Sequence, residues 1–238
     1  MSSSNTSAHR AGRPRASTEN AASTLSGREQ ILDAAAALFV EFGFSGTSTR
    51  AIADRVGIRQ QSLYYHFAGK DEILVELLSN SVRPSNEFVA SVEARVPHDA
   101  SAAGALYALA LVDAQTLRRT PHNIGTLYLH PEVEDARFDA FRLERSQLRA
   151  AYGRLGAAAA HPEVTASLTE TRLGTLLIQI AELVIQLRRD GETDASDEAT
   201  IAASCLRALG LTSAEIARAH TEAEGLIALA HEGFAYHA

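Results

Sequence analysis

The sequence predicts an all-α protein, and three observations support this prediction. Apolar residues recur at steps of three and four from residue 28 onward, as they do on one face of a helix. No stretch alternates apolar and polar residues over a useful length, so no half-buried strand is indicated. Glycines and prolines divide the chain into segments of helix length, without a repeat of about 20 to 50 residues.

The composition is that of a globular protein. The chain has 238 residues, 46% of them hydrophobic, and a net charge of -7. This length suffices for one large domain or for a small domain joined to a larger one. The single cysteine, Cys205, excludes an intrachain disulfide and is expected to be a small buried hydrophobe. Without an apolar run of about 18 residues or a signal-peptide core, the sequence predicts a cytoplasmic protein with no membrane partner.

Charge is distributed unevenly along the chain. Residues 1–70 carry eight basic and five acidic side chains, whereas the remainder carries 14 basic and 24 acidic ones. A basic front on an acidic body is typical of a small nucleic-acid-binding head joined to a body with another role. Residues 1–26 lack periodicity and large apolar side chains, which predicts a disordered basic arm. Its segment Ala11–Arg15 resembles hooks that lie in the minor groove, but it also fits a solvated tail.

The elements of the head follow from local signals. A first helix is predicted from Arg28 to Gly43, where glycine supplies a left-handed cap. Thr47 is expected to cap the N-terminus of a second helix, which Gly57 ends. A third, short helix then directs its apolar residues inward (Leu63, Tyr64 and Phe67). Helix, glycine turn and helix in this order form the helix-turn-helix layout.

The body begins with a fourth helix that starts at Lys70 after a cap at Gly69. This helix is expected to end at Pro84, which lacks a backbone N–H. Further helices are predicted over residues 101–119, 134–160, 167–189, 196–209 and 213–232. The expected domains are a helix-turn-helix head over residues 27–72 and a ligand-binding and dimerisation body over residues 73–238.

A specific motif lies at the centre of the head. Residues 47–70 read T-S-T-R-A-I-A-D-R-V-G-I-R-Q-Q-S-L-Y-Y-H-F-A-G-K. Together with the preceding Phe-x-x-x-Gly, this segment resembles the DNA-binding pattern of TetR-family regulators. The matching positions are Phe39, Gly43, Thr47, Ile52, Ala53, Gly57, Leu63, Tyr64, His66, Phe67 and Lys70. The resemblance is detailed over residues 28–78, and it implies a head that binds a double-stranded DNA operator and a body that binds a small-molecule effector and forms a homodimer.

The start of the third helix is the expected reading surface. Polar side chains there enter the major groove, where glutamine pairs with adenine and arginine with guanine, while flanking residues contact phosphates. The expected DNA-binding residues are Thr47, Thr49, Arg50, Arg59, Gln60, Gln61, Ser62, Tyr65, His66 and Lys70. By resemblance, Tyr65 and Lys70 are phosphate ligands. His66 fits a half-buried packing residue equally well, and Arg59 replaces the Ser or Thr that often caps this helix in the family.

The apolar helices of the body carry scattered polar residues. A mainly apolar pocket with a few polar groups is typical of a ligand site. The expected ligand-binding residues are Tyr107, Leu111, Gln115, Tyr128, Phe141 and Gln179. Gln179, Glu182 and Gln186 also fit a solvated or interface stripe. Residues 173–187 and 201–209 are expected to form a four-helix bundle with a partner copy.

These features predict a repressor that a small molecule releases from a palindromic operator. Two alternatives stay open: an all-α enzyme built on Asp113 and Glu182, and a DNA-architectural protein that uses the arm. The sequence contains no G-x-S-x-G, Gly-rich phosphate loop or H-E-x-x-H, so no catalytic residue and no cofactor are expected. The cluster of His130, Glu132, Glu134 and Asp135 matches no structural zinc spacing, so no metal is expected.

Overall fold

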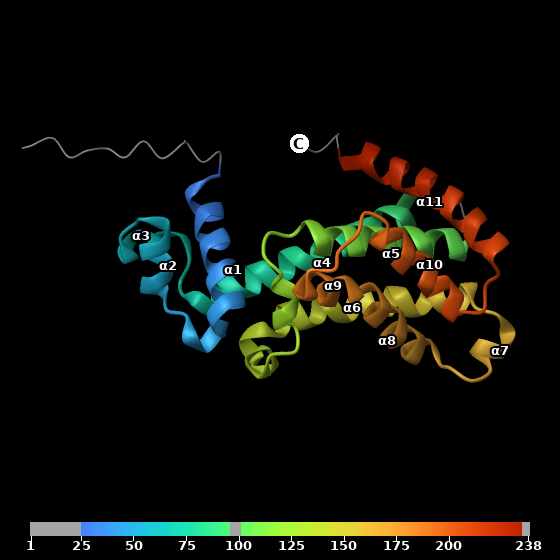
Figure 1. The fold of residues 1–238 in the computed structure, drawn as a ribbon, viewed down its shortest axis with the longest axis horizontal. Coiled ribbons are helices and arrows are strands. Elements are labelled where there is room, and N and C mark those ends of the chain that lie inside the picture. The colour runs from blue at the N-terminus through green and yellow to red at the C-terminus, as the bar shows by residue number, and fades with distance from the viewer. Residues whose placement is uncertain (1–24, 96–100, 235–238) are drawn as a thin grey trace, which may run out of the picture.

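The computed structural model describes residues 25–95 and 101–234, which contain helices and no strand, as the sequence predicts. A small head of α1, α2 and α3 lies at one end, and α4 joins it to an elongated helical body (Figure 1). Apart from Leu25 and Ser26, the arm expected over residues 1–26 lies outside the described residues, as does its segment Ala11–Arg15.

The helices follow one another along the chain, with short 3-10 turns (η) in the body. In the head and the connection to the body they are α1 Gly27–Gly46, α2 Thr49–Val56, α3 Gln60–His66 and α4 Lys70–Arg95. In the first half of the body they are α5 Ala102–Arg119, η1 Ile124–Leu127, η2 Pro131–Glu134, η3 Ala136–Phe138 and α6 Asp139–Ala159. The chain closes with α7 Pro162–Thr165, α8 Glu170–Ala181, α9 Leu183–Asp190, α10 Asp197–Ala208 and α11 Ser213–Phe234.

Reciprocal capping fixes the start of α1. The Ser26 hydroxyl accepts a hydrogen bond from the Glu29 N–H, and the Glu29 carboxylate accepts one from the Ser26 N–H. This capping box satisfies two of the N–H groups that every helix start leaves free. Gly43, at φ 76°, interrupts the helix as predicted, although a further turn continues to Gly46. Gly57, at φ 82°, ends α2 in the left-handed conformation, which confirms the second glycine signal.

Thr47 does not cap α2, so this prediction is wrong. The cap is Ser48, whose hydroxyl accepts from the Ala51 N–H at 3.1 Å. Thr47 is buried, with its hydroxyl 3.2 Å from the Leu38 carbonyl oxygen and 2.9 Å from that of Gly43. The hydroxyl therefore satisfies carbonyls that the interrupted end of α1 leaves free.

Pro84 does not end α4, which continues to Arg95. Proline inside a helix costs about 3 kcal/mol, because it removes a hydrogen bond and crowds the preceding turn. Here side chains both before and after Pro84 are buried against the body. Ser81 and Ser85 are fully buried, and Phe88 is 4% exposed. Ending the helix at Pro84 would expose Phe88 and remove Ser85 from its buried position.

The helix predicted over residues 134–160 begins only at Asp139. Before it, the chain makes the tight turns η2 and η3, and the Asp135 carboxylate accepts from the Arg137 N–H at 3.0 Å. Val133 and Phe138 are buried and hold these turns against the core. A carboxylate that bonds locally to the backbone competes with helix formation, which is why the helix starts late.

The helix predicted over residues 167–189 is two helices. Thr169 caps α8, and the helical hydrogen bonds break at Glu182 before α9 resumes. Nη2 of Arg145 donates to both oxygens of the Glu182 carboxylate, at 2.6 and 2.7 Å, and Nε of Arg145 donates to one of them at 3.1 Å. The break lets α9 leave the line of α8 and pack against α5 and η1.

Helices α6 and α8 of the body approach each other closely at two glycines. A Cβ on Gly174 of α8 would collide with the Arg149 carbonyl oxygen, and a Cβ on Gly153 of α6 would lie 2.7 Å from the Glu170 carbonyl oxygen. Because neither obstacle is a flexible side chain, the backbones approach only where both side chains are missing.

We therefore expect Gly174→Ala to lower the free energy of unfolding by about 1 to 3 kcal/mol, because the two helices must separate. Gly225→Ala is the matched control, since Gly225 lies in α11 with open space around its Cα. That substitution should stabilise the protein by about 0.5 to 1 kcal/mol through helix propensity. Urea denaturation of both variants tests this, and equal effects would contradict the glycine contact.

Candidate functional site

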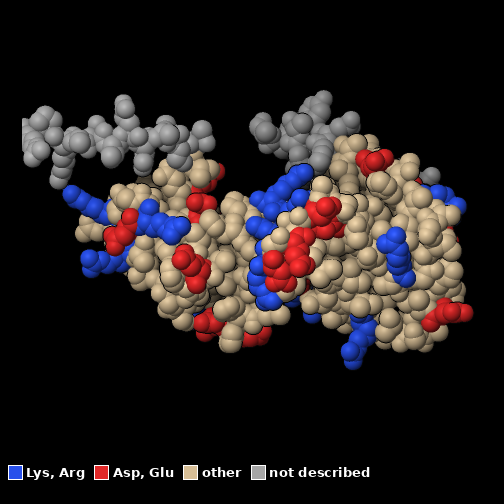
Figure 2. All heavy atoms as spheres, in the orientation of Figure 1, with Lys and Arg blue, Asp and Glu red and all other residues tan. Residues whose placement is uncertain are grey.

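The first turn of α3 presents an exposed polar surface at the tip of the head. Arg59, Gln60, Gln61 and Ser62 are all exposed, while Leu63 is fully buried beneath them. Arg59 occupies the N-cap position and makes no side-chain cap, as its length predicts. Basic side chains stand out from this end of the molecule, where Arg50, Arg55 and Arg59 are exposed (Figure 2).

A hydrogen-bonded group links α2 to α3 on this surface. Gln60 donates to the Thr49 hydroxyl at 2.9 Å, and that hydroxyl lies 3.2 Å from the Tyr64 hydroxyl. Tyr64 is 50% exposed, so its assignment to the core is wrong. A helix of seven residues fills its buried side with Leu63 alone, and Phe67 follows it as the C-cap. Gln60 and Tyr64 are four residues apart, and this spacing in the sequence indicates that the two side chains lie on the same face of the helix.

The side chains of Gln61, Ser62 and Tyr65 on α3 make no hydrogen bond within the described part of the chain. Gln61 makes no hydrogen bond there, so its amide can offer both a donor and an acceptor. Tyr65 is 88% exposed, with its ring edge-on to His66 at 5.4 Å. His66 itself is half-buried beside Gly27, and its carbonyl oxygen accepts from Arg28 at 2.7 Å.

Thr47 and Lys70, both expected to bind DNA, donate to backbone carbonyl oxygens inside the head. The hydroxyl of Thr47 is directed into the protein, so this buried residue positions α2 and cannot reach a phosphate. The Lys70 ammonium donates to the carbonyl oxygens of Phe44 at 2.8 Å and Thr47 at 3.0 Å, and lies 4.3 Å from the centre of the Phe44 ring. Arg50 is exposed beside Asp54, 3.8 Å away.

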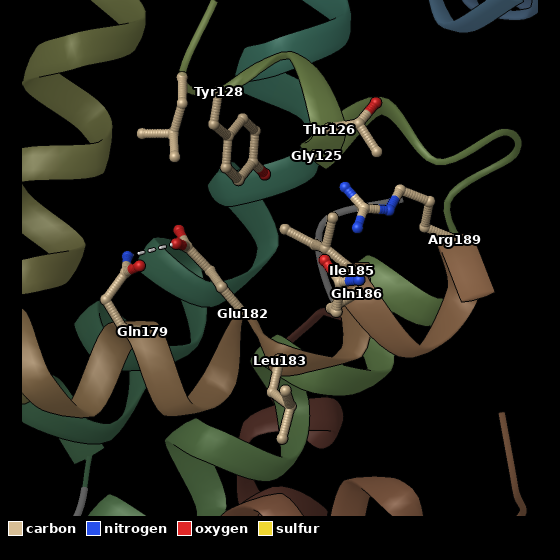
Figure 3. Close-up of a pocket in the computed structure, with 10 residues that line it drawn as sticks. Gly125, Thr126, Tyr128, Gln179, Glu182, Leu183, Ile185, Gln186 and Arg189 are labelled. Atoms are coloured by element: carbon tan, nitrogen blue, oxygen red, sulfur yellow. Dashed lines mark hydrogen bonds between the residues drawn. The ribbon is translucent and has the colours of Figure 1, made fainter. Parts of the chain in front are cut away.

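The six expected ligand-binding residues do not meet in one pocket. Tyr128 and Gln179 line a hollow of about 320 Å³ between η1 and the α8–α9 break, which we call hollow A (Figure 3). Tyr128 and Phe141 line a neighbouring hollow of about 240 Å³ along α6, which we call hollow B. Gln115 lines a separate groove beside α4, and Leu111 is half-buried on α5.

Tyr107 lies in another part of the body. Its buried ring stacks on His220 with the ring centres 5.1 Å apart, and its hydroxyl donates to the Ala199 carbonyl oxygen at 3.4 Å. It therefore packs α5 against α10 and α11 rather than facing a hollow.

A charged pair that the sequence did not predict separates the two hollows. Glu182 accepts from Gln179 at 2.7 Å on the side of hollow A, as Figure 3 shows, and pairs with Arg145, which lines hollow B. The Arg145 guanidinium lies 5.3 Å from the centre of the Tyr128 ring. The Tyr128 hydroxyl is 2.6 Å from that of Ser81 on α4, and burial raises the pKa of this tyrosine.

A second buried polar group lies deeper in the body. Asp113 is 2% exposed and accepts from the hydroxyls of Ser85 at 2.8 Å and Tyr152 at 2.9 Å. Burial raises the pKa of Asp113 to about 6, although both hydroxyl donors act in the opposite direction. Cys205 is fully buried, as predicted, and burial raises its pKa to about 12.

The acidic cluster near Pro131 has local partners. Glu132 accepts from the Ser45 hydroxyl of the head at 2.7 Å, and His130 lies 3.6 Å from the same carboxylate. In residues 25–95 and 101–234 no group of three His, Cys, Asp or Glu side chains gathers as metal ligands would. Over the same residues, no helix has both the length and the apolar character needed to cross a bilayer.

Comparison with protein families gives a match over the head. The family described as "Bacterial regulatory proteins, tetR family" matches residues 31–77, from the first turns of α1 into α4. The HTH-type transcriptional repressor KstR2 of Mycobacterium tuberculosis is 51% identical over 51 residues, which are 21% of this chain and 26% of that protein. The chain thus spans about a quarter of the length of this curated relative.

Solved structures extend the similarity to the body. AmtR of Mycobacterium smegmatis is 38% identical, with a TM-score of 0.73, over 85% of this chain and 96% of that one. The ketosteroid transcriptional regulator KstR2 of Mycobacterium tuberculosis has a TM-score of 0.62 over 79% of this chain and 95% of that one. At 21% identity, the second comparison shows a shared fold alone.

We expect the stability of the protein to depend on pH through Asp113. The folded state holds this proton more tightly than the unfolded chain, where an aspartate has a pKa near 3.9. Asp113 therefore contributes to the free energy of unfolding at low pH, where it is protonated. This contribution falls by about 2 to 3 kcal/mol as the pH rises from about 4 through about 6. Asp113→Asn should remove this fall. Urea denaturation at several pH values measures it, and parallel pH profiles for both proteins would refute the assignment.

Proposed function

We propose, from the premise that the chain belongs to the TetR family of bacterial regulatory proteins, that it is a transcriptional repressor released from a palindromic DNA operator by a small molecule. The observation that carries this proposal is the exposed polar turn that begins α3, supported from below by Leu63. A helix start of this kind is the element that reads base edges in the major groove.

Within this surface the free and the engaged side chains suggest a division of roles. Gln61 has its whole amide available and is the base-reading residue, with Arg59, Gln60 and Ser62 beside it. Tyr65 is a phosphate ligand, and Thr49, Arg50 and His66 flank the same surface. Lys70 acts mainly by closing the turn between α1 and α2, with one ammonium hydrogen left for a phosphate.

The self-association surface is narrower than the two expected helical faces. Leu173, Leu177, Ile201 and Leu206 are each at most 2% exposed, because they pack inside the chain, and they are therefore unable to contact a partner. The exposed apolar residues of α8 and α9 are Leu176 at 40% and Leu183 at 47%. We assign dimerisation to this outer face, since exposed apolar residues grouped on a surface favour association.

The effector belongs in the hollows on either side of Tyr128. The Tyr128 hydroxyl is hydrogen-bonded to Ser81 of α4, the helix that enters the head. A ligand in either hollow would therefore touch a residue that is bonded to α4. The proposed domains, residues 27–72 and 73–238, are therefore functional units joined by one continuous helix. A ligand acts only through different affinities for two conformations, and α4 offers a direct route for that difference.

The enzyme alternative rests on two carboxylates that are already bound by other side chains of the protein. Asp113 is enclosed by Ser85 and Tyr152, and Glu182 is neutralised by Arg145. Neither presents a free carboxylate to a substrate. We therefore favour a regulator without catalytic activity, acting on DNA in the cytoplasm.

The test is selection of binding sites from random duplex DNA, followed by affinity measurements on the selected and a scrambled duplex. We expect a palindrome whose half-sites lie about 34 to 36 Å apart or a multiple of this. Gln61→Ala should cost about 1 to 3 kcal/mol on the selected site alone, because it removes a base contact. Tyr65→Phe should cost about 1 kcal/mol on both duplexes, because it removes a phosphate contact. Equal losses for both variants on both duplexes would contradict the division of roles.

We further expect light scattering at micromolar concentration to give twice the chain mass of 25.4 kDa. Leu176→Glu should shift the protein toward the monomer, because a buried unpaired carboxylate is costly at an interface. Leu143→Glu provides the control, since Leu143 is 60% exposed and lies on α6 rather than on α8 or α9. A wild-type monomer, or identical behaviour of the two variants, would exclude this surface.

A further inference from the structure

Hollow B is lined by arginines although the body as a whole is acidic. Helix α6 places Arg142, Arg145, Ser146 and Arg149 on one face, at steps of three and four residues. Residues 71–238 carry 14 basic and 24 acidic side chains, so this concentration of positive charge runs against the background. Glu134 is the acidic residue among those that line the hollow.

The positive charge of hollow B is incompletely neutralised. Arg145 is paired with Glu182, which faces the neighbouring hollow. Arg142 binds the Glu134 carbonyl oxygen and pairs with the carboxylates of Asp139 and, at 3.5 Å, Glu134. Arg149 makes no ion pair and no hydrogen bond within the described part of the chain, and its guanidinium is therefore available to a ligand.

We propose that the effector carries a carboxylate or phosphate group that binds in hollow B between Arg142, Ser146 and Arg149. This inference rests on the proposed function and adds the chemical class of its ligand. Guanidinium groups match both kinds of anion with paired N–H donors, and the Ser146 hydroxyl adds a further donor. Tyr128 and Phe141 supply the apolar wall for the rest of the molecule.

A large apolar ligand fits this hollow poorly. A space of about 240 Å³ accepts a small molecule, and an apolar occupant would cover Arg149, which has no partner within the described residues, without offering it an acceptor. Covering a charged group without a partner is strongly unfavourable. Size and charge thus both favour a small acid.

The same site explains how such an acid is sensed. An anion beside Arg145 competes with Glu182 for its guanidinium, and Glu182 lies at the break between α8 and α9. Loss of that pairing frees the start of α9.

Helix α9 in turn binds the segment between α5 and η1, and this segment contacts the head. Arg188 donates to the carbonyl oxygens of Thr120 at 2.9 Å and His122 at 3.0 Å. The His122 ring lies 3.1 Å from the Asp33 carboxylate on α1. A shift of α9 therefore reaches the head by a second route, independent of α4.

The experiment is isothermal titration of the full chain with succinate and, separately, with inorganic phosphate, at constant ionic strength and pH. The neutral 1,4-butanediol serves as the matched ligand control. Arg149→Gln removes the free guanidinium, and Arg154→Gln removes one charge from α6 outside the hollow, where Arg154 pairs with Glu93 at 2.7 Å. We expect at least one acid to bind, the diol not to bind, and Arg149→Gln to weaken binding about tenfold or more while Arg154→Gln stays near wild type. The acid that binds more tightly identifies the group.

Absence of binding by both acids, or equal binding to both variants, overturns the proposal. Affinity for the selected operator, measured without any acid, tests the proposed function separately. A protein that binds its operator but neither acid keeps the proposed function and loses this inference. A protein that binds an acid through Arg149 but selects no DNA keeps the anion site and loses its assignment as an effector site. Where both bindings are found, addition of the acid must weaken operator binding, and an unchanged affinity also overturns the proposal.

Discussion

The arrangement of head and body depends on the continuity of α4 through Pro84. A proline at this position costs about 3 kcal/mol and would ordinarily mark the end of a helix. The serines on either side of it, Ser81 and Ser85, bond to Tyr128 and Asp113 of the body. These buried hydrogen bonds would be broken if the helix ended, and unpaired buried partners are costly. The body therefore holds α4 by hydrogen bonds before and after Pro84, and the helix remains one element from Lys70 to Arg95.

The two polar groups that bond to α4, Asp113 with Tyr152 and Tyr128 by itself, have different roles. Asp113 and Tyr152 lie in the buried interior, where Asp113 accepts hydrogen bonds from both Ser85 and Tyr152 and thereby fixes one arrangement of α4, α5 and α6. Tyr128 lies at the edge of that interior, with its hydroxyl on α4 and its ring beside the hollows. The first group holds the helix in place, and the second exposes it to whatever occupies the hollows. In the proposed regulator, stability and the response to a ligand would thus depend on neighbouring turns of the same helix.

Much of the head could be predicted from the sequence, because its signals are local. Gly57 ends α2 where expected, and Leu63 and Phe67 are buried as their spacing predicts. The failures are those that depend on how one helix meets the next. Thr47 satisfies carbonyls of α1, so Ser48 takes the cap, and Tyr64 lies outside a core that Leu63 already fills. A local pattern does not show which side of a short helix the rest of the head will cover.

In the body the sequence predicted helices but not how they meet. Glu182 stands in a continuous apolar pattern, and its break becomes clear only beside Arg145, 37 residues earlier in the chain. The expected ligand residues were chosen for their chemistry, and three of them, Tyr128, Phe141 and Gln179, lie along two adjoining hollows. Tyr107 went to a different contact because α10 and α11 cover it. Pairing between distant helices decides these outcomes, and no single segment encodes it.

Lys70 is the only lysine in the chain, and the other members of its 22 lysine and arginine residues are arginines. Its amine is therefore the one side-chain target for reagents that acylate amines, and it lies where the turn between α1 and α2 is closed by its bonds to Phe44 and Thr47. An amine with both carbonyls bound is shielded from acylation, whereas an opened turn releases it. The rate of its acylation consequently reports, at a single atom and without any introduced label, how often the reading head opens.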